Sequence, residues 1–160
     1  MPNILIVDDQ PCIRELLGEE LVSEGYRIQS TGNARSVRGH VKSSWPDLVL
    51  LDLYLDGLDG WEVLRDIKRQ DPHLPVIIFT AYDSFVDDPR LSEADGYVIK
   101  SVCLDELKQK IGDVLNWKTG RERKKEVESW RQIPKSLSST SMSKRSCWDG
   151  RIILMRRQRN

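Results

Sequence analysis

Cysteine, histidine and long apolar runs are scarce in this chain. The three cysteines, Cys12, Cys103 and Cys147, lie far apart, and neither of the two histidines stands near one of them. This spacing argues against a zinc site and indicates plain thiols. No apolar run approaches the roughly 20 residues that cross a membrane, and residues 1–3 lack the basic start of a secretory signal. We therefore expect a cytoplasmic protein without a membrane segment.

The chain also lacks a net charge, but its charges are unevenly distributed. Residues 1–116 hold 12 Lys/Arg and 21 Asp/Glu, a net charge of −9, whereas residues 117–160 hold 13 and 4, a net charge of +9. A length of 160 residues fits one ordinary domain with a remainder. We expect one domain over 1–117, followed by a basic tail over 118–160 that is largely disordered or partly extends the last helix.

Short apolar runs alternate with helical patterns through the first part of the chain. The unbroken run over 48–51, framed by Asp47 and Asp52, is typical of a strand buried on both faces. Further strands are expected over 3–7, 26–31, 75–79 and 96–99, and helices over 11–24, 34–41, 59–70 and 104–115. Residues 53–58 read as a loop, and Pro89 makes any helix within 82–95 short or irregular. The pattern predicts an α/β fold, a doubly wound five-stranded parallel sheet of (βα)5 type.

Polar residues follow four of the five predicted strands. Asp8 and Asp9 follow the first, Asp52 the third, Thr80 the fourth and Lys100 the fifth. In open parallel sheets, chemistry takes place just outside the carboxyl ends of the strands. Three converging carboxylates repel one another unless a hard cation such as Mg²⁺ joins them. A lysine and a hydroxyl can neutralise the charge of a transferring phosphoryl group and donate hydrogen bonds to its oxygens. One carboxylate is then free to act as a nucleophile.

The same residues belong to motifs that together resemble a known family. The motifs are Ile6-Val7-Asp8-Asp9, Pro46-Asp47-Leu48-Val49-Leu50-Leu51-Asp52, Asp59-Gly60-Trp61-Glu62-Val63-Leu64, Phe79-Thr80-Ala81 and Gly96-Tyr97-Val98-Ile99-Lys100. Over about residues 2–117 they resemble a response-regulator receiver domain, the phospho-acceptor module of two-component signalling. This resemblance implies a flavodoxin-like sheet with the strand order 2-1-3-4-5.

The resemblance also implies a role for each acidic residue. Asp52 would accept a phosphoryl group from a phosphohistidine. Asp9 and Asp52 would bind Mg²⁺ through their carboxylates, Tyr54 through its backbone carbonyl, and Asp8 through a metal-bound water. The implied cofactor is therefore Mg²⁺, with no enzymatic activity beyond the chain's own phosphorylation and dephosphorylation.

Three further residues would carry the response. Lys100 would pair with the phosphoryl oxygens, and Thr80 would donate a hydrogen bond to them. Tyr97 would then turn inward and change the face formed by the fourth helix, fifth strand and fifth helix. In this way the charge added by phosphorylation would shift that surface between two states. Tyr54 and Tyr82 flank the site and are expected to tune hydrolysis of the acyl phosphate.

The resemblance implies particular partners. The phosphodonor would be a sensor histidine kinase or a histidine phosphotransfer protein. A downstream protein, or a second copy of the chain, would bind the face that Tyr97 changes. The basic tail is too short for a helix-turn-helix domain. The simpler interpretation is a solvated segment, but the tail's net charge is also compatible with a nucleic-acid contact.

The chain departs from the family pattern in the loops around the site. Ser101 stands where the family usually has proline after the lysine, and Asp56 stands where the loop after the acceptor usually carries proline. The stretch 82–95 is less helical than the family's. These departures bear on the lysine loop and on the output surface more than on the acidic residues.

Two other functions of similar sheets fit the sequence less well. A Mg²⁺-dependent phosphatase with an aspartate nucleophile would want a second aspartate two residues after it, where this chain has Tyr54. A flavin-binding module needs a Ser/Thr/Gly phosphate loop after the first strand, whereas Asp8-Asp9-Gln10-Pro11 has the opposite charge.

Overall fold

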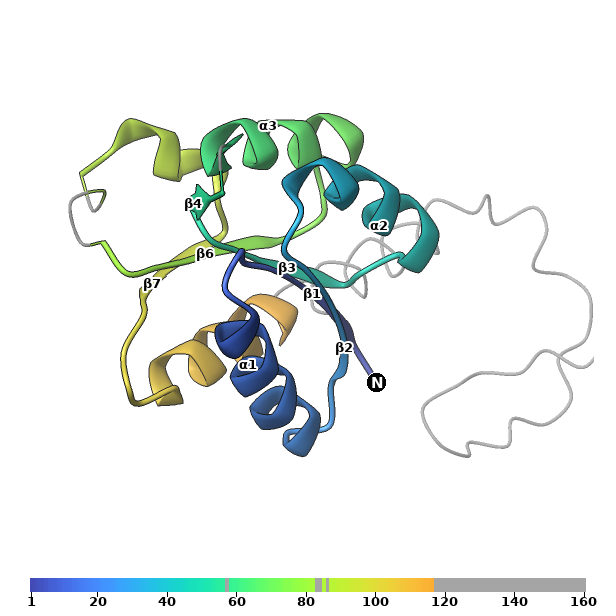
Figure 1. Cartoon of the computed structure of the whole chain (residues 1–160), viewed down its shortest axis with the longest axis vertical. Coiled ribbons are helices and arrows are strands. Elements are labelled where there is room, and N and C mark those ends of the chain that lie inside the picture. The colour runs from blue at the N-terminus through green and yellow to red at the C-terminus, as the bar shows by residue number, and fades with distance from the viewer. Residues whose placement is uncertain (57, 83–84, 86, 117–160) are drawn as a thin grey trace, which may run out of the picture. The chain divides into compact units, whose positions relative to one another are not determined.

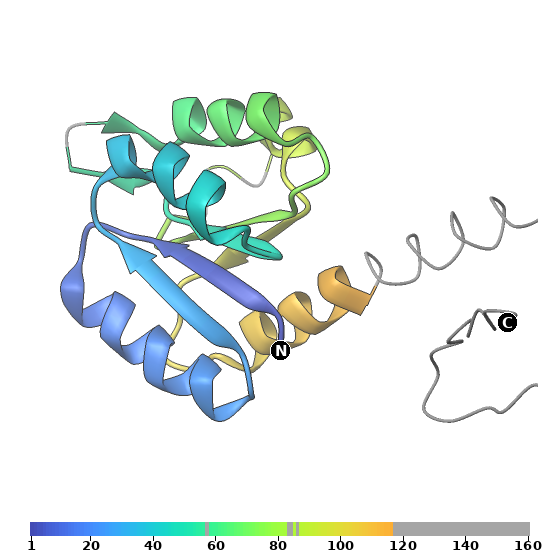
Figure 2. The same cartoon turned by 90° about the vertical axis from the view of Figure 1, so that its right-hand side faces the viewer.

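A five-stranded parallel sheet forms the centre of the described chain (Figures 1 and 2). The computed structural model describes residues 1–56, 58–82, 85 and 87–116, so the predictions for the tail lie outside the described residues. The strands are β1 (Asn3–Val7), β2 (Arg27–Thr31), β3 (Leu48–Leu51), β6 (Val76–Thr80) and β7 (Gly96–Ile99). Their order is β2-β1-β3-β6-β7. This confirms the predicted order 2-1-3-4-5, since β4 and β5 lie outside the main sheet.

Helices cover both faces of this sheet. In Figures 1 and 2, α1 (Pro11–Ser23) and the helix over residues 105–116 lie on one face, and α2 (Val37–Ser44) and α3 (Gly60–Gln70) lie on the other. Successive strand residues point to opposite faces. Ile4 and Ile6 therefore join the core under α1, while Leu5 and Val7 join the core under α2 and α3. No helix among the described residues is long and apolar enough to cross a membrane.

The strand register brings the polar strand ends to one edge. Val7 is paired with Leu51, and the amide of Asp52 donates to the carbonyl oxygen of Val7 at 2.9 Å. Thr80, the last residue of β6, is paired with Ile99. Residues directly after β1, β3 and β7 therefore lie side by side, at the carboxyl edge of the sheet.

The loop predicted over 53–58 is partly wrong. It contains a small antiparallel pair, β4 (Tyr54–Leu55) with β5 (Leu58–Asp59). Two contacts bring the start of α3 back to the end of β3. Asp59 caps α3 by accepting from the amide of Trp61, and the amide of Gly60 donates to the carbonyl oxygen of Leu53 at 3.0 Å. A Cβ at Gly60 would lie 2.5 Å from the Cα of Leu53, so the two backbones touch.

The residues described within 82–95 are as irregular as predicted. They contain one short 3-10 helix, η2 (Pro89–Glu93), which Asp88 caps by accepting from the amide of Arg90. Another 3-10 helix, η1 (Ala34–Ser36), precedes α2. On α1, Leu17 and Leu21 are buried, whereas Leu16 is 48% exposed.

Candidate functional site

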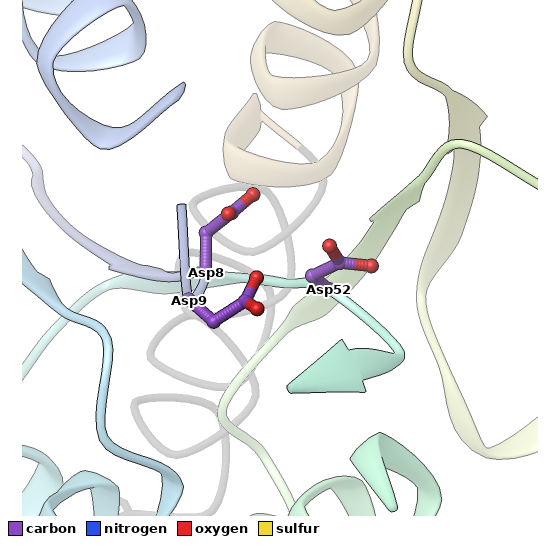
Figure 3. Close-up of side chains that lie close together, drawn as sticks. All are labelled: Asp8, Asp9 and Asp52. Atoms are coloured by element: carbon purple, nitrogen blue, oxygen red, sulfur yellow. The ribbon is translucent and has the colours of Figure 1, made fainter. Parts of the chain in front are cut away.

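Three aspartates converge at the carboxyl edge of β1 and β3. Asp8 and Asp9 extend from the end of β1 and Asp52 from the end of β3 (Figure 3). Each offers a carboxylate oxygen, and these oxygens lie within 4.8 Å of one another. Asp8 and Asp52 are 2% and 5% exposed, while Asp9 is half-buried. The predicted acidic cluster therefore forms in the structure.

Lys100 bridges the two buried carboxylates. Its Nζ lies 2.7 Å from Oδ2 of Asp8 and 2.5 Å from Oδ2 of Asp52. Burial raises the pKa of the Asp8 carboxyl, although hydrogen bonds from Lys100 and from the amide of Gln10 oppose this shift. Burial would lower the pKa of Lys100, but its hydrogen bonds to Asp52 and Asp8 outweigh burial and raise that pKa. The lysine is therefore held as a cation against the acidic cluster.

Thr80 contributes a hydroxyl that is buried without a partner. The residue is fully buried, and its Oγ1 has no hydrogen-bond partner within the described part of the chain. Buried polar atoms are nearly always paired, so such a group calls for an explanation. A bound phosphoryl oxygen near the acidic cluster would give this hydroxyl an acceptor.

Main-chain groups orient the carboxylates. The amide of Tyr54 donates to Oδ1 of Asp52 at 3.2 Å, and the amide of Gln10 donates to Oδ1 of Asp8 at 2.9 Å. The carboxylate of Asp9 receives no hydrogen bond from the residues that the structure describes. The donor set fits Mg²⁺ chemically, because this ion prefers carboxylate and carbonyl oxygens together with water.

The loop after Lys100 is closed by Ser101. Every peptide bond of the described residues is trans. The hydroxyl of Ser101 donates to the carbonyl oxygen of Cys103 at 2.6 Å. Lys100 reaches both carboxylates from this loop, so serine in place of the family's proline is compatible with the lysine's position.

An aromatic cluster lies beside the acidic residues. The rings of Tyr54 and Tyr82 have centroids 4.3 Å apart, and both side chains are half exposed. Phe85 connects Tyr54 to Trp61, with ring centroids 6.1 Å and 5.8 Å apart. The hydroxyl of Tyr97 donates to the carbonyl oxygen of Tyr82. Tyr97 is half-buried and packs against the core under α2 and α3, so the predicted switch residue already points inward.

One residue that contacts the site was missed by sequence reasoning. Arg14 on α1 donates to the backbone carbonyls of Asp8 and Asp9. The available signal was an arginine one turn into the helix that follows the acidic pair. A lone arginine on an amphipathic helix is usually solvated, so its position alone did not single it out.

Fold and site together define an open α/β protein with a lysine-bridged cluster of aspartates where its strand order reverses. The family model of the response regulator receiver domain matches residues 4–112. The chain is 36% identical over 117 residues to the transcriptional regulatory protein AfsQ1 of Streptomyces coelicolor, covering 72% of this chain and 52% of that protein. It is also 36% identical to sporulation initiation phosphotransferase F of Bacillus subtilis, covering 73% of this chain and 96% of that protein.

Solved structures agree with these matches. The response regulator protein TrrA of Thermotoga maritima, in complex with Mg²⁺-BeF, is 41% identical with a TM-score of 0.68, covering 71% of this chain and 99% of that one. TrrA in complex with the histidine kinase ThkA is 42% identical, also with a TM-score of 0.68, covering 72% and 99%. The chain belongs to the response regulator receiver domain family. It spans about half of the length of AfsQ1 and about a quarter of that of the Escherichia coli regulator GlrR.

Proposed function

We propose that this receiver domain accepts a phosphoryl group on Asp52 from a histidine kinase or a histidine phosphotransfer protein. Two observations carry the proposal: Lys100 bridges two buried carboxylates of the acidic cluster, and the buried Thr80 hydroxyl has no hydrogen-bond partner among the described residues. The kinase complex of the relative TrrA supports a kinase as the donor. A cytoplasmic location belongs to the same proposal.

The chain's own residues account for the transfer. A carboxylate oxygen of Asp52 attacks the phosphorus atom, and the bond between phosphorus and the donor's imidazole nitrogen breaks. The imidazole leaves with the electron pair and takes a proton from solvent. Lys100, already at the Asp52 carboxylate, would pair with the phosphoryl oxygens, and Thr80 would donate its hydrogen bond to one of them. The phosphatase alternative has no support at Tyr54, because a tyrosine cannot replace its second carboxylate.

The carboxylates of Asp9 and Asp52 and the carbonyl of Tyr54 would hold Mg²⁺, with Asp8 acting through a metal-bound water. The ion would supply positive charge to the phosphoryl oxygens during transfer. The clustering of three carboxylates supports this assignment, as does the Mg²⁺-BeF complex of the relative TrrA.

The output would pass through Tyr97. When Thr80 moves toward the phosphoryl group, the segment that holds Tyr82 would move with it, and the hydrogen bond from Tyr97 to the Tyr82 carbonyl would draw Tyr97 further inward. The changed face around β7 would then bind a downstream protein or a second copy of the chain. Apart from self-phosphorylation and hydrolysis of the acyl phosphate, no catalytic activity is proposed.

A nucleic-acid contact through residues 117–160 is a second candidate for the output. It is supported by the net charge of +9 over these residues, and relatives such as AfsQ1 are transcriptional regulators. Contacts with phosphates weaken steeply as salt rises. DNA binding at low salt that disappears on deletion of 117–160 would support this candidate, whereas no binding at low salt would contradict it.

The proposed function can be tested with a small phosphodonor. Incubation with acetyl phosphate and Mg²⁺ should add one labile phosphoryl group to the intact mass, and Asp52→Asn should abolish the addition. Asp56→Asn is a matched control, because Asp56 is an exposed acid in the following loop. A phosphoryl group on Asp52→Asn, or none on the wild-type chain, would contradict the proposal.

A further inference from the structure

Arg14 contacts the backbone that carries the acidic pair. Its Nη1 lies 2.7 Å from the carbonyl oxygen of Asp8 and 3.0 Å from that of Asp9. The side chain is half-buried, and its own amide continues the first turn of α1 by donating to Gln10. None of the roles proposed for the site uses this guanidinium, so its position needs a separate explanation.

The two carbonyls fix the direction in which Asp9 points. One belongs to the peptide group before Asp9 and the other to the peptide group after it, and peptide groups are planar. Holding both therefore limits the backbone rotation at Asp9. The carboxylate of Asp9 has no hydrogen bond of its own among the described residues, so its place in the cluster depends on this backbone.

Gly32, just after β2, leaves the space that the guanidinium occupies. A Cβ at Gly32 would lie 2.7 Å from Nη1 and 3.3 Å from Cζ of Arg14, and 3.4 Å from the carbonyl oxygen of Asp8. The closest of these atoms is the far end of a long side chain, which can move away more easily than backbone can. A side chain at position 32 would therefore displace the guanidinium and break its bonds while leaving the fold in place.

We propose that Arg14 is a positioning residue for the metal-binding carboxylates, and that Gly32 is part of the same device. The proposal rests on the proposed function, since it takes Asp8 and Asp9 as the acidic residues of a Mg²⁺ site. Arg14 acts by holding two main-chain carbonyls, which aims the Asp9 carboxylate at the cation without touching it. Groups that orient metal ligands typically change metal affinity by about 10- to 100-fold when they are removed.

The direction in which Mg²⁺ affinity changes when Arg14 is removed distinguishes a positioning role from a purely electrostatic one. A cation close to a divalent metal repels it, so removing the Arg14 charge alone would strengthen Mg²⁺ binding. Loss of positioning has the opposite effect, because a mobile Asp9 must be ordered when Mg²⁺ binds. A weaker site in Arg14→Ala therefore cannot come from the lost charge.

The test is a Mg²⁺ titration of the full chain. Binding is followed by the NMR shifts of the Asp9 and Asp52 amides, and function by the initial rate of phosphorylation by acetyl phosphate at each Mg²⁺ concentration. Arg14→Ala should raise the half-saturating Mg²⁺ concentration about tenfold, with little change in the rate at saturating Mg²⁺. The half-saturating Mg²⁺ concentration of Arg14→Lys should lie between those of the wild-type chain and Arg14→Ala, because an ammonium lacks the planar fork of a guanidinium.

Two further variants complete the test. Gly32→Ala keeps the charge and displaces the guanidinium, so it should weaken Mg²⁺ binding in the same direction as Arg14→Ala. Arg35→Ala removes an equal charge from an exposed residue of the adjoining η1 and should leave Mg²⁺ binding unchanged. Should Arg14→Ala fail to fold, Gly32→Ala decides the question.

Unchanged or tighter Mg²⁺ binding in Arg14→Ala would overturn the proposal, as would an equal effect in Arg35→Ala. A lower melting temperature with an unchanged half-saturating Mg²⁺ concentration would also overturn it, since Arg14 would then only stabilise the fold. A wild-type chain that binds Mg²⁺ but gains no phosphoryl group would contradict the proposed function alone, because the shift titration still decides the role of Arg14.

Discussion

Asp8 combines a buried carboxylate with a lysine partner that does not fully compensate for burial. Its pKa is raised in the folded chain because burial disfavours the charged form. A carboxyl whose pKa is higher when folded than when unfolded destabilises the fold at neutral pH. That destabilisation lessens as the pH falls below the folded pKa, where the group becomes neutral in the fold, and it is gone below the unfolded pKa. A cation bound as proposed would offset this electrostatic penalty.

We expect Asp8→Asn to raise the melting temperature at pH 7 in the presence of a metal chelator. The gain should shrink as the pH is lowered, because the wild-type carboxyl then takes up a proton. Thermal unfolding followed by circular dichroism over a pH series measures both effects. Mg²⁺ should stabilise the variant less than the wild-type chain. A lower melting temperature for the variant at pH 7 would mean that the ion pair with Lys100 outweighs burial.

The tilted contact between the rings of Tyr54 and Tyr82 yields a second prediction at the residue scale. Tyr54 follows Asp52 closely, its amide bonds the Asp52 carboxylate, and its ring packs on Tyr82. Tyr54→Ala and Tyr82→Ala should each shorten the lifetime of the phosphorylated chain severalfold, because water reaches the acyl phosphate more easily. The decay of the phosphorylated mass after removal of the donor gives the lifetime. Trp45→Ala, at an exposed residue before β3, is the control, and an equal change there would refute the shielding effect.

At the scale of elements, Gly60 lets the first turn of α3 pack on the backbone of Asp52 and Leu53, which follow β3. A Cβ at this position would meet backbone atoms only, at 2.5 Å from the Cα of Leu53 and 2.7 Å from the carbonyl oxygen of Asp52. Backbone cannot move aside as a side chain can. The first turn of α3 therefore needs glycine to pack directly on the chain that leaves β3.

Gly60→Ala should destabilise the fold by about 1–3 kcal/mol, the usual range for overpacking. Gly39→Ala is the matched control, because Gly39 lies within α2 and has open space around its Cα. There, alanine should stabilise the helix by about 0.5–1 kcal/mol. Chemical denaturation of both variants measures the two changes. Equal signs would show that the contact with Leu53 does not limit residue 60.

The elements also show what the sequence could predict. Continuous apolar runs such as 48–51 identify buried strands, and the residue after each run must then lie at the carboxyl edge, so Asp52, Thr80 and Lys100 could be placed. The β4–β5 pair could not, because two-residue strands leave no periodic pattern. The bridge from Lys100 and the bonds of Arg14 depend on side-chain directions that only the packed structure defines.

At the scale of the whole molecule, the sheet separates two apolar layers and leaves the site at one edge. Ion pairs join distant parts of the fold: Lys108 on the helix over 105–116 lies 2.9 Å from Glu20 of α1, and Lys68 of α3 lies 2.6 Å from Asp95. The residues proposed to accept and sense the phosphoryl group lie within this part of the fold. The acidic cluster of Asp8, Asp9 and Asp52 is formed by described residues of the sheet edge.

A chain truncated after residue 117 should therefore keep its phosphorylation on Asp52 at a rate close to that of the full chain. The rate with acetyl phosphate and Mg²⁺, followed by intact mass, compares the two. Circular dichroism of the truncated chain is the control for folding. A folded but unreactive truncated chain would place part of the phosphorylation machinery in the tail.

In the proposed function, the carboxylate of Asp52 becomes an acyl phosphate. The most direct measurement is borohydride reduction of the chain after treatment with acetyl phosphate and Mg²⁺, followed by peptide mass mapping, because borohydride reduces an aspartyl phosphate to homoserine. Homoserine at position 52, and unmodified aspartate at positions 8, 9 and 56, is the expected result. Homoserine at another position, or unmodified aspartate at position 52 in a chain that has gained the mass of a phosphoryl group, would contradict it.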